Sequence, residues 1–384
     1  MRRPALALAL LALAPACRRH RRGARARDPR REFATACPDP RYVNAPAVPA
    51  PSAGGGEVRS VATARLAGRR HVAWVTDEGA ALWREGSPVA TRVTPPIPGG
   101  SFAMDATAER LVMAWPSLER QVLVAAFDAS GAARAFPPWA GGVAEVALAA
   151  APDGALVAWR DARGVMARPL GPRGELLGAP ELVAPPPADA PAVAWAGGAW
   201  AVVWRAAEGG AGFVRMRTIG RDGAPRGPAV DVVRTDAGVG PPSARWGGGR
   251  LALAWSDARN GDRGLQSVAV GRDGRSLAEP QRLSVRFAEG ARASIAWDGA
   301  AFGVAWWEPV GGGAPRSFFA LLDRSGRRIG TGMRLLADDD AAPLTAPAVD
   351  WERPQYVIAA ARGREVEVRR TGPLGCDLPP YAPR

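Results

Sequence analysis

Carboxylates and arginines recur at fixed distances from tryptophans in this sequence. Asp161 and Arg163 stand two and four residues after one tryptophan, and Asp257 and Arg259 stand at the same distances from another. Two carboxylates that the fold brings together can cleave a glycosidic bond, whatever their spacing in the sequence. The repeated Asp-Ala-Arg pattern also suits an ion pair or a turn cap. We treat these residues and Glu308 as candidates for a ligand-binding face, with a structural role as the alternative.

Residues for metal or nucleophilic chemistry are few. The only histidines are His20 and His71, so the sequence cannot assemble a His-based catalytic triad or a site with several His ligands. The run Asp338, Asp339 and Asp340 could contribute oxygen ligands to Ca²⁺, but it lacks the spaced ligands and the Gly turn of a dedicated loop, and a solvated link is the alternative. The glycine clusters indicate turns rather than a phosphate loop. We expect no cofactor.

Tryptophan is the most conspicuous residue type, and aromatic side chains can bind sugars. Most of these tryptophans occupy fixed positions in short apolar strands, which favours a packing role. Trp139 and Trp307 break that period and fall in or beside expected loops. They are therefore the aromatic residues that we expect to contact a ligand.

A short apolar strand that ends in Ala-Trp, or a close variant of it, repeats along the chain. Successive copies are separated by 41, 44, 45, 51, 51 and 54 residues, which is the length of a four-stranded propeller blade. The last copy has lost its tryptophan. The repeat is anchored at Trp74, Trp115, Trp159, Trp204, Trp255, Trp306 and Ala360.

Each unit carries further strand and turn signals. A second tryptophan stands nine residues before each later anchor, and Gly-rich turns such as Gly247-Gly248-Gly249 predict a tight hairpin between the two. Another strand, a turn ending in Gly such as Asp323-Arg324-Ser325-Gly326, and a fourth strand follow. The sequence therefore predicts an all-β protein with seven four-stranded blades over residues 57–376.

A ring is the expected arrangement of these units, because an open array would leave sheet edges exposed and no capping repeat is visible. The seventh unit lacks a good final strand, since prolines follow it. We predict that Arg41 to Val48 supplies that strand and pairs with the chain near Val366 and Val368. Disulfide formation between Cys37 and Cys376 would hold this closure, and two unrelated thiols are the alternative.

The blades resemble those of β-propeller repeat proteins of bacterial envelopes, including lipoprotein-like members, which carry an Ala-Trp strand and an Asp-x-x-Gly turn. This resemblance covers most of the chain after residue 56 and concerns structure only. The Trp-Asp ending of WD40 blades, the paired glycines of kelch blades and the Asp-box of sialidase-type propellers are absent from the sequence.

The N-terminus predicts export. Arg2 and Arg3 precede an apolar run, and small residues precede Cys17, as in a bacterial lipoprotein signal. Ala14 stands where that signal has Leu, so lipidation of Cys17 and free secretion both remain open. The expected organisation is a signal at 1–17, a basic arm at 18–40, a Pro/Gly-rich segment at 41–56 that supplies the closing strand, the propeller at 57–376, and a tail at 377–384.

The formal net charge of +13 is concentrated near the N-terminus. Eight arginines lie within residues 18–32, and the rest of the chain carries only a diffuse excess. No stripe suited to nucleic acid is therefore predicted. We expect a monomeric, non-enzymatic binding or scaffold module in the cell envelope or secreted, whose variable loop face binds a protein or a glycan. A carbohydrate-active enzyme, either a glycosidase or a lyase, and a purely structural spacer are the alternatives.

Overall fold

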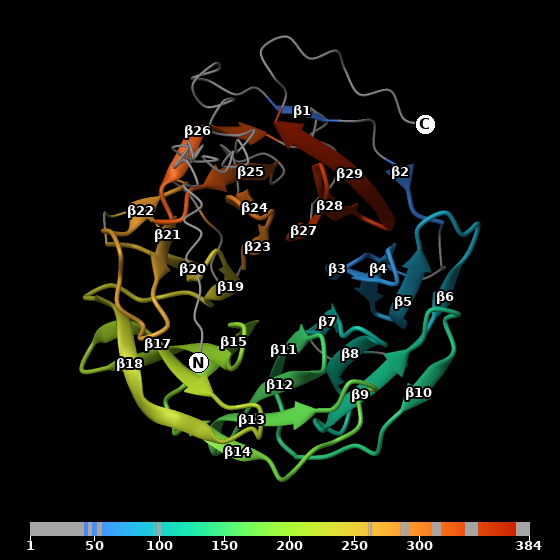
Figure 1. Cartoon of the computed structure of the whole chain (residues 1–384), viewed down its shortest axis with the longest axis horizontal. Coiled ribbons are helices and arrows are strands. Elements are labelled where there is room, and N and C mark those ends of the chain that lie inside the picture. The colour runs from blue at the N-terminus through green and yellow to red at the C-terminus, as the bar shows by residue number, and fades with distance from the viewer. Residues whose placement is uncertain are drawn as a thin grey trace, which may run out of the picture. The chain divides into compact units, whose positions relative to one another are not determined.

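The computed structural model describes residues 42–44, 48–51, 56–95, 97, 101–259, 261, 263–284, 287, 292–308, 316–334 and 345–373. The chain divides into two units, Met1–Pro38 and Asp39–Arg384, and every described residue belongs to the second. The described residues of that unit form strands joined by turns and loops, and seven antiparallel sheets form a ring (Figure 1). It is a seven-bladed β-propeller, as the repeat predicts.

Blades 1 to 6 are each built from four consecutive strands. In chain order these strands are β3 (Ser60–Leu66), β4 (Arg69–Thr76), β5 (Gly79–Arg84), β6 (Ala90–Arg92), β7 (Ala103–Ala106), β8 (Leu111–Pro116), β9 (Val122–Phe127), β10 (Ala133–Ala135), β11 (Glu145–Ala151), β12 (Gly154–Asp161), β13 (Gly164–Leu170), β14 (Glu181–Ala184), β15 (Asp189–Trp195), β16 (Trp200–Glu208), β17 (Ala211–Ile219), β18 (Pro225–Thr235), β19 (Ser243–Gly247), β20 (Arg250–Asp257), β21 (Gly264–Val270), β22 (Gln281–Arg282), β23 (Ser294–Trp297), β24 (Phe302–Glu308), β25 (Arg316–Leu322) and β26 (Arg328–Arg334).

Blade 7 joins the two ends of the propeller. Its strands β27 (Ala348–Glu352), β28 (Gln355–Arg362) and β29 (Glu365–Pro373) pair in order, and β1 (Tyr42–Asn44) adds to the free edge of β29. The next short strand, β2 (Val48–Pro49), pairs with β29 through Val48 and Val368. The predicted closure of the ring by an N-terminal strand is therefore confirmed.

The hydrophobic core lies between the blades. Seven apolar clusters are present among the described residues, and each combines side chains from two adjacent blades. The anchor tryptophans belong to these clusters, and Trp159, Trp204 and Trp255 are completely or almost completely buried. Strands that pack on both faces are apolar at nearly every position, which explains why the anchor strands read as continuous apolar runs.

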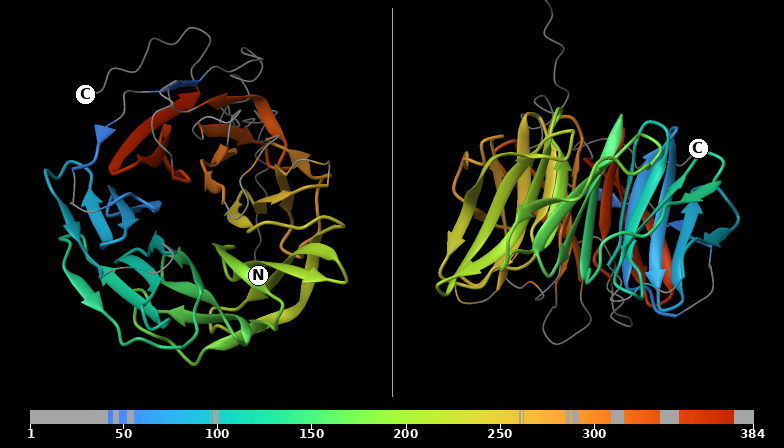
Figure 2. Two further views of the ribbon diagram at one scale, coloured as in Figure 1. Left: turned by 180° about the vertical axis from the view of Figure 1, so that it is seen from behind. Right: turned by 90° about the horizontal axis from the view of Figure 1, so that it is seen from below.

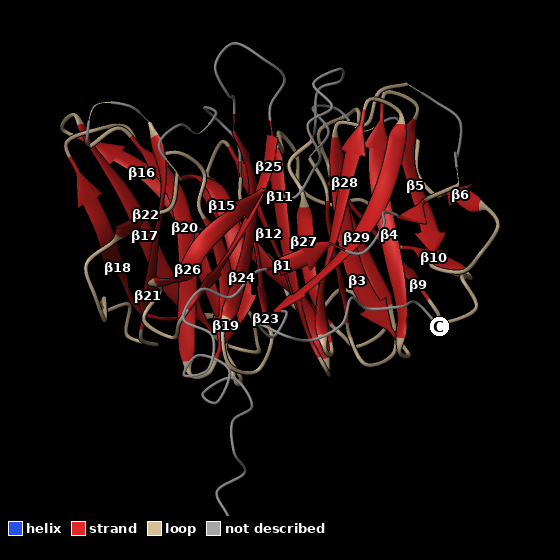
Figure 3. Cartoon of the chain, turned by 90° about the horizontal axis from the view of Figure 1, so that it is seen from above, coloured by secondary structure: helices blue, strands red, loops and turns tan. Residues whose placement is uncertain are grey.

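Loops and turns divide between two faces of the propeller (Figure 2 and Figure 3). The hairpin between the first and second strands of a blade and the turn between its third and fourth strands lie on one face, which we call the turn face. The loops between second and third strands and the links between blades lie on the other, which we call the loop face. The first strand of every blade runs from the loop face to the turn face beside the central axis.

The Asp-x-x-Gly turn is held by its first residue. In blade 6, Asp323 Oδ1 accepts hydrogen bonds from the backbone N–H groups of Ser325 (2.8 Å) and Arg327 (3.0 Å). Gly326 has a φ of +84°, and a side chain there would meet the backbone of Ala269 in blade 5. The glycine therefore allows both the turn and the close approach of two blades.

Candidate functional site

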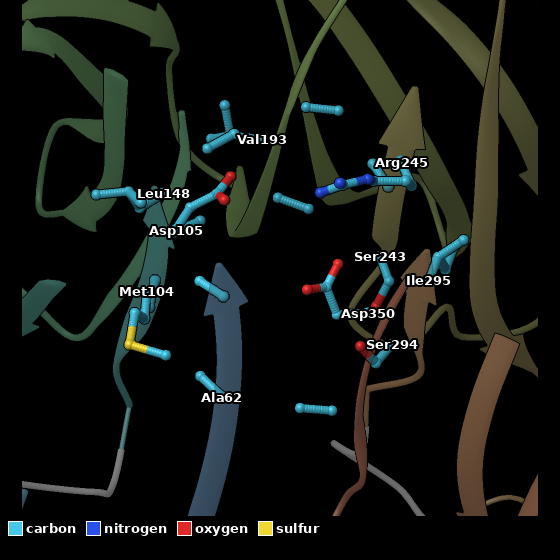
Figure 4. A pocket seen from close by; sticks show the side chains of 18 of the residues that line it. Ala62, Met104, Asp105, Leu148, Val193, Ser243, Arg245, Ser294, Ile295 and Asp350 are labelled. Atoms are coloured by element: carbon cyan, nitrogen blue, oxygen red, sulfur yellow. The ribbon is translucent and has the colours of Figure 1, made fainter. Parts of the chain in front are cut away.

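A central cavity of about 1550 Å³ runs along the inner strands of the seven blades. Most side chains along the middle of its wall are small or apolar, such as Ala62, Leu148 and Val193 (Figure 4). Polar side chains are few at this level, so those that are present determine what the cavity can bind.

Three charged residues face the cavity from equivalent positions of three separate blades. Asp105 is on β7, Arg245 on β19 and Asp350 on β27 (Figure 4), and each pairs in its sheet with the residue three positions before the anchor of its blade. We call them the charged triad. The four other blades have alanine at this position, namely Ala64, Ala149, Ala194 and Ala296. Small neighbours leave space around the triad.

Asp105 is fixed by two backbone N–H groups. Its Oδ1 accepts a hydrogen bond from Ala106 N (2.8 Å), and its Oδ2 accepts one from Ala150 N on the next blade (2.9 Å). Burial raises the pKa of the Asp105 carboxyl, while nearby Arg245 and the two N–H donors oppose the shift and Asp350 adds to it. This carboxylate is therefore oriented and partly desolvated, and its pKa depends on the two other residues of the triad.

Asp350 belongs to an ion-pair network at the seam between blades 7 and 1. It accepts hydrogen bonds from Trp351 N (2.8 Å) and from Arg70 Nη1 (3.1 Å). The Arg70 side chain is only 1% exposed and also donates to Glu352 at 2.8 Å. Asp350 thus has a fixed orientation and a buried cationic partner. The networks around Asp105 and Asp350 make the site rigid.

Arg292 spans the end of the cavity at the loop face. From blade 6 it donates to the carbonyls of Pro242 in blade 5 (2.7 Å) and Pro191 in blade 4 (3.3 Å), and it pairs with Glu145 in blade 3 at 3.3 Å. Burial lowers the pKa of its guanidinium, an effect that Glu145 opposes. One side chain therefore joins four blades across this end of the cavity.

Indole rings from blades 4 to 7 line the opposite end of the cavity, at the turn face. Trp195, Trp246, Trp297 and Trp351 line the cavity there, and each is partly exposed. Trp297 also packs against the backbone of Gly247 and Gly248 in the preceding blade, where any added side chain would overlap the ring. These tryptophans therefore pack between blades and also frame the cavity.

Arginines cover three of these indoles. The guanidinium carbons of Arg221, Arg272 and Arg324 lie 5.0, 5.4 and 5.9 Å from the ring centroids of Trp195, Trp246 and Trp297, respectively. Each arginine comes from the turn between the third and fourth strands of the same blade. These are cation–π distances, so the indoles hold the arginines in place.

The Asp-Ala-Arg residues form ion pairs within the blades. Asp161 is buried, accepts a hydrogen bond from Trp159 Nε1 (3.0 Å) and pairs with Arg163 at 2.7 Å. Burial alone would raise the pKa of Asp161, but the hydrogen bonds from Arg163 and Trp159 outweigh it and lower that pKa. In blade 5, Asp257 makes the same two contacts, accepting from Trp255 Nε1 (2.8 Å) and pairing with Arg259 at 2.6 Å.

The other aromatic and acidic candidates have different surroundings. Trp139 is buried, with its ring centroid 6.4 Å from that of Trp159 in an edge-to-face arrangement. Trp307 lines the central cavity. Burial raises the pKa of Glu308, and its Oε2 has no hydrogen-bond partner among the described residues. Ligand binding by the sequence-derived candidates remains a prediction.

Several predicted features lie outside the described residues. These are Cys17, the proposed pair Cys37 and Cys376, the acidic run Asp338 to Asp340, and His20. Within the described part of the chain, His, Cys, Asp and Glu do not gather in any group of three that could hold a metal ion. The same residues include no helix of the length and apolarity needed to cross a membrane.

The sequence interpretation missed the charged triad and Arg292. A signal for the triad was present, because aligning the units on the second tryptophan places Asp105, Arg245 and Asp350 in a column that is otherwise alanine. Such a column lies on an inner strand, and a charge there points to the axis. Arg292 has no comparable signal, since its partners come from three other blades.

Known structures share this fold. The chain is similar to the WD40 domain of coronin from Toxoplasma gondii, with 10% identity and a TM-score of 0.55 over 88% of each chain. It is similar to the Dos1 propeller, with 10% identity and a TM-score of 0.53 over 84% of this chain and 95% of that one. An ancestral GH74 enzyme matches at 12% identity, with a TM-score of 0.55 over 83% of this chain and 48% of the enzyme. At such low sequence identity, the structural similarity establishes the fold alone.

No protein-family model matches the sequence, and no curated protein does so either. A proposal about function therefore depends on the geometry of the cavity and its charged residues.

Proposed function

We propose that this protein is a non-enzymatic glycan-binding module that takes a sugar of its ligand into the central cavity. The observation that carries the proposal is the charged triad, which places two carboxylates and one guanidinium in a wall of small side chains. A rigid scaffold with a few oriented polar groups is typical of ligand sites. The cavity favours binding over a purely structural role, in which no such site is needed.

The chemistry of the triad favours a neutral, hydroxyl-bearing ligand. Asp105 and Asp350 can accept hydrogen bonds, while Arg245 can donate several. A sugar hydroxyl both donates and accepts, so adjacent hydroxyls can bond to carboxylate and guanidinium at once. A ligand with a single charge would meet both attraction and repulsion within the same layer. This site in the cavity is a different one from the loop face that the sequence interpretation favours.

Calorimetric titration of the purified full chain with a panel of neutral mono- and oligosaccharides tests the proposal. We expect saturable binding that D105N and R245Q each weaken by about tenfold, since each removes a charge-assisted hydrogen bond. R163Q on the loop face serves as the control and should bind like the unmodified protein. If R163Q abolishes binding while D105N leaves it intact, the loop face is the site. A panel without any binding sugar would reject the glycan proposal.

Glycoside cleavage is a second candidate, because burial raises the pKa of Asp105 and a general acid needs such a shift. Asp350 would then be the partner carboxylate. Incubation of the same sugars with the protein and analysis of the products by mass spectrometry separates the candidates. Cleavage that D105N abolishes, with one water added across the broken bond, supports a glycosidase. Intact sugars recovered after binding support the non-enzymatic module.

Export to the cell envelope is a further part of the proposal. It is supported by Arg2 and Arg3, the apolar run that follows them and Cys17. Intact mass of the protein extracted from its own cells, with and without reductant, would report cleavage before Cys17, an added acyl group and a disulfide between Cys37 and Cys376. An unprocessed chain with three free thiols would contradict export.

A further inference from the structure

Five arginines on the turn face of blades 5 and 6 lack an acidic partner among the described residues. All five side chains belong to exposed residues, and none forms an ion pair with a described carboxylate. Their described hydrogen bonds go only to backbone carbonyls: Arg250 donates to Gly249 O (3.1 Å) and Arg272 to Ala196 O (2.6 Å). We call this set the basic surface; it consists of Arg250, Arg272, Arg324, Arg327 and Arg328.

The carboxylates of the same turns are occupied by other contacts. Asp323 accepts from backbone N–H groups and from the hydroxyl of its own turn, and Asp273 accepts from Arg275 N (3.2 Å). Asp298 accepts from Ala300 N and Ala301 N, each at 2.8 Å. These aspartates cap turns, and none of them forms an ion pair with a guanidinium of the basic surface; Asp273 instead lies 3.6 Å from Arg275.

Two members of the basic surface connect it to the cavity. Arg272 stacks over Trp246 and Arg324 over Trp297, and both indoles line the cavity at the turn face. Stacking on a ring and bonding to a backbone carbonyl restrict the guanidinium before any ligand binds, which lowers the entropy cost of binding. A chain that leaves the cavity past these indoles would next meet the arginines.

We propose that the basic surface binds the acidic groups of a polysaccharide whose terminal sugar occupies the cavity. The proposal rests on the proposed function and narrows its ligand to a glycan that carries carboxylates or sulfates. Guanidinium groups bind these planar or tetrahedral anions through paired hydrogen bonds. Arginines on two adjacent blades suit an anion that recurs along a polymer better than a single small anion.

Binding of two matched oligosaccharides to the full chain tests this proposal. The acidic probe is a galactose oligomer with sulfates on its internal sugars and a neutral terminal galactose, and the neutral probe is the unsulfated galactose oligomer of the same length. In R324Q/R327Q/R328Q we expect affinity for the acidic probe to fall by about tenfold or more, with a weaker dependence on salt. Affinity for the neutral probe should stay unchanged. D105N should weaken binding of both probes.

The control R110Q/R173Q/R226Q removes the same charge from ion pairs elsewhere on the turn face. It should leave acidic binding within about twofold, because each of these arginines is already paired with a carboxylate, in one half-buried and two exposed pairs. Equal losses in both triple variants would show a general charge effect and overturn the proposal. So would equal affinity for acidic and neutral probes, or binding of anionic lipid vesicles or DNA in place of the acidic oligomer.

The two proposals fail in different ways. Suppose that D105N changes the affinity for neither the acidic nor the neutral probe, while R324Q/R327Q/R328Q still weakens binding of the acidic probe. The basic surface is then a site in its own right, and the cavity proposal is rejected. If only D105N has an effect, the cavity proposal stands and the basic surface is rejected.

Discussion

Two sectors of the turn face use the arginines of the turn between the third and fourth strands in opposite ways. In blades 3 and 4, Arg173 pairs with Glu109 at 2.9 Å and Arg221 pairs with Asp153, and each partner lies in the first hairpin of the preceding blade. In blade 5, Arg272 reaches the equivalent hairpin of blade 4 but finds only a backbone carbonyl there. Whether the arginine is paired therefore depends on the residues in the first hairpin of the preceding blade.

The hairpin sequences explain why. Blades 2 and 3 carry an acidic residue in the turn, whereas blades 4 and 5 carry the glycine turns Gly197-Gly198 and Gly247-Gly248-Gly249. Glycine is required in blade 5, because Trp297 packs directly on Gly247 and Gly248. The positions that hold Glu109 and Asp153 in blades 2 and 3 are Gly198 and Gly249 in blades 4 and 5, and their φ values of +151° and +78° disfavour a side chain there. The glycine turns of the later hairpins therefore leave the arginines without a carboxylate.

Arg70, at the seam between blades 7 and 1, is a buried arginine with two carboxylate partners, in contrast to the exposed arginines of the turn face. We expect R70M to destabilise the protein by about 3 to 5 kcal/mol, because it leaves Asp350 and Glu352 without their buried cation. Urea unfolding followed by tryptophan fluorescence measures this. R65Q is the control, since Arg65 is half-exposed and lies 3.8 Å from Glu352, and it should cost less than about 1 kcal/mol. Similar losses in both variants would contradict the importance of burial.

Acid should affect an aspartate of the cavity and an aspartate of the turn face in opposite directions. Asp105 has a raised pKa, so its contribution makes the folded state less stable as pH rises from the unfolded value near 3.8 through the folded pKa. Hydrogen bonds from Ser130 and other turn groups lower the pKa of Asp128 to about 2, so its stabilisation is present above pH 4 and is lost as pH falls toward 2.

Unfolding free energies of D105N and D128N between pH 2 and 6 check this contrast. The unfolding free energy of D105N, relative to that of the unmodified protein, should increase as pH rises. The relative unfolding free energy of D128N should decrease over the same range. Parallel curves for the two variants would show that the environments of the two carboxyls do not differ in the expected way.

The propeller scaffold could be predicted from the sequence because the residues that determine each blade lie close together in the chain. Anchor spacing defined the blades, turn glycines defined the hairpins, and the weak last strand indicated that an N-terminal segment closes the ring. The tryptophans were also correctly interpreted as packing residues, and Trp159 and Trp255 are buried. Each of these features depends on residues within one blade or on the seam between the first and last blades.

The charged triad was not predicted, because the orientation of its residues depends on contacts between blades. The loop candidates Asp161 and Asp257 drew attention through their repeated spacing, yet their repetition follows from a structural bond to the anchor indole. Asp105, by contrast, replaces the alanine that four of the seven blades have at its position, and it depends on Ala150 N of the next blade for its orientation. In a repeat protein, residues that depart from the repeat are better candidates for a site than residues that follow it.

Removing carboxylates from the paired sector should convert it toward the unpaired one. In E109Q/D153N, Arg173 and Arg221 lose their acidic partners, while Trp195 still holds Arg221 in place. Affinity for the acidic oligomer should then rise by a few fold at low salt, because two more guanidiniums join the basic surface. Stability should change by less than about 1 kcal/mol, since both pairs are exposed. A gain for the neutral oligomer as well would mean that the hairpin carboxylates act by shielding the cavity and not by neutralising the arginines.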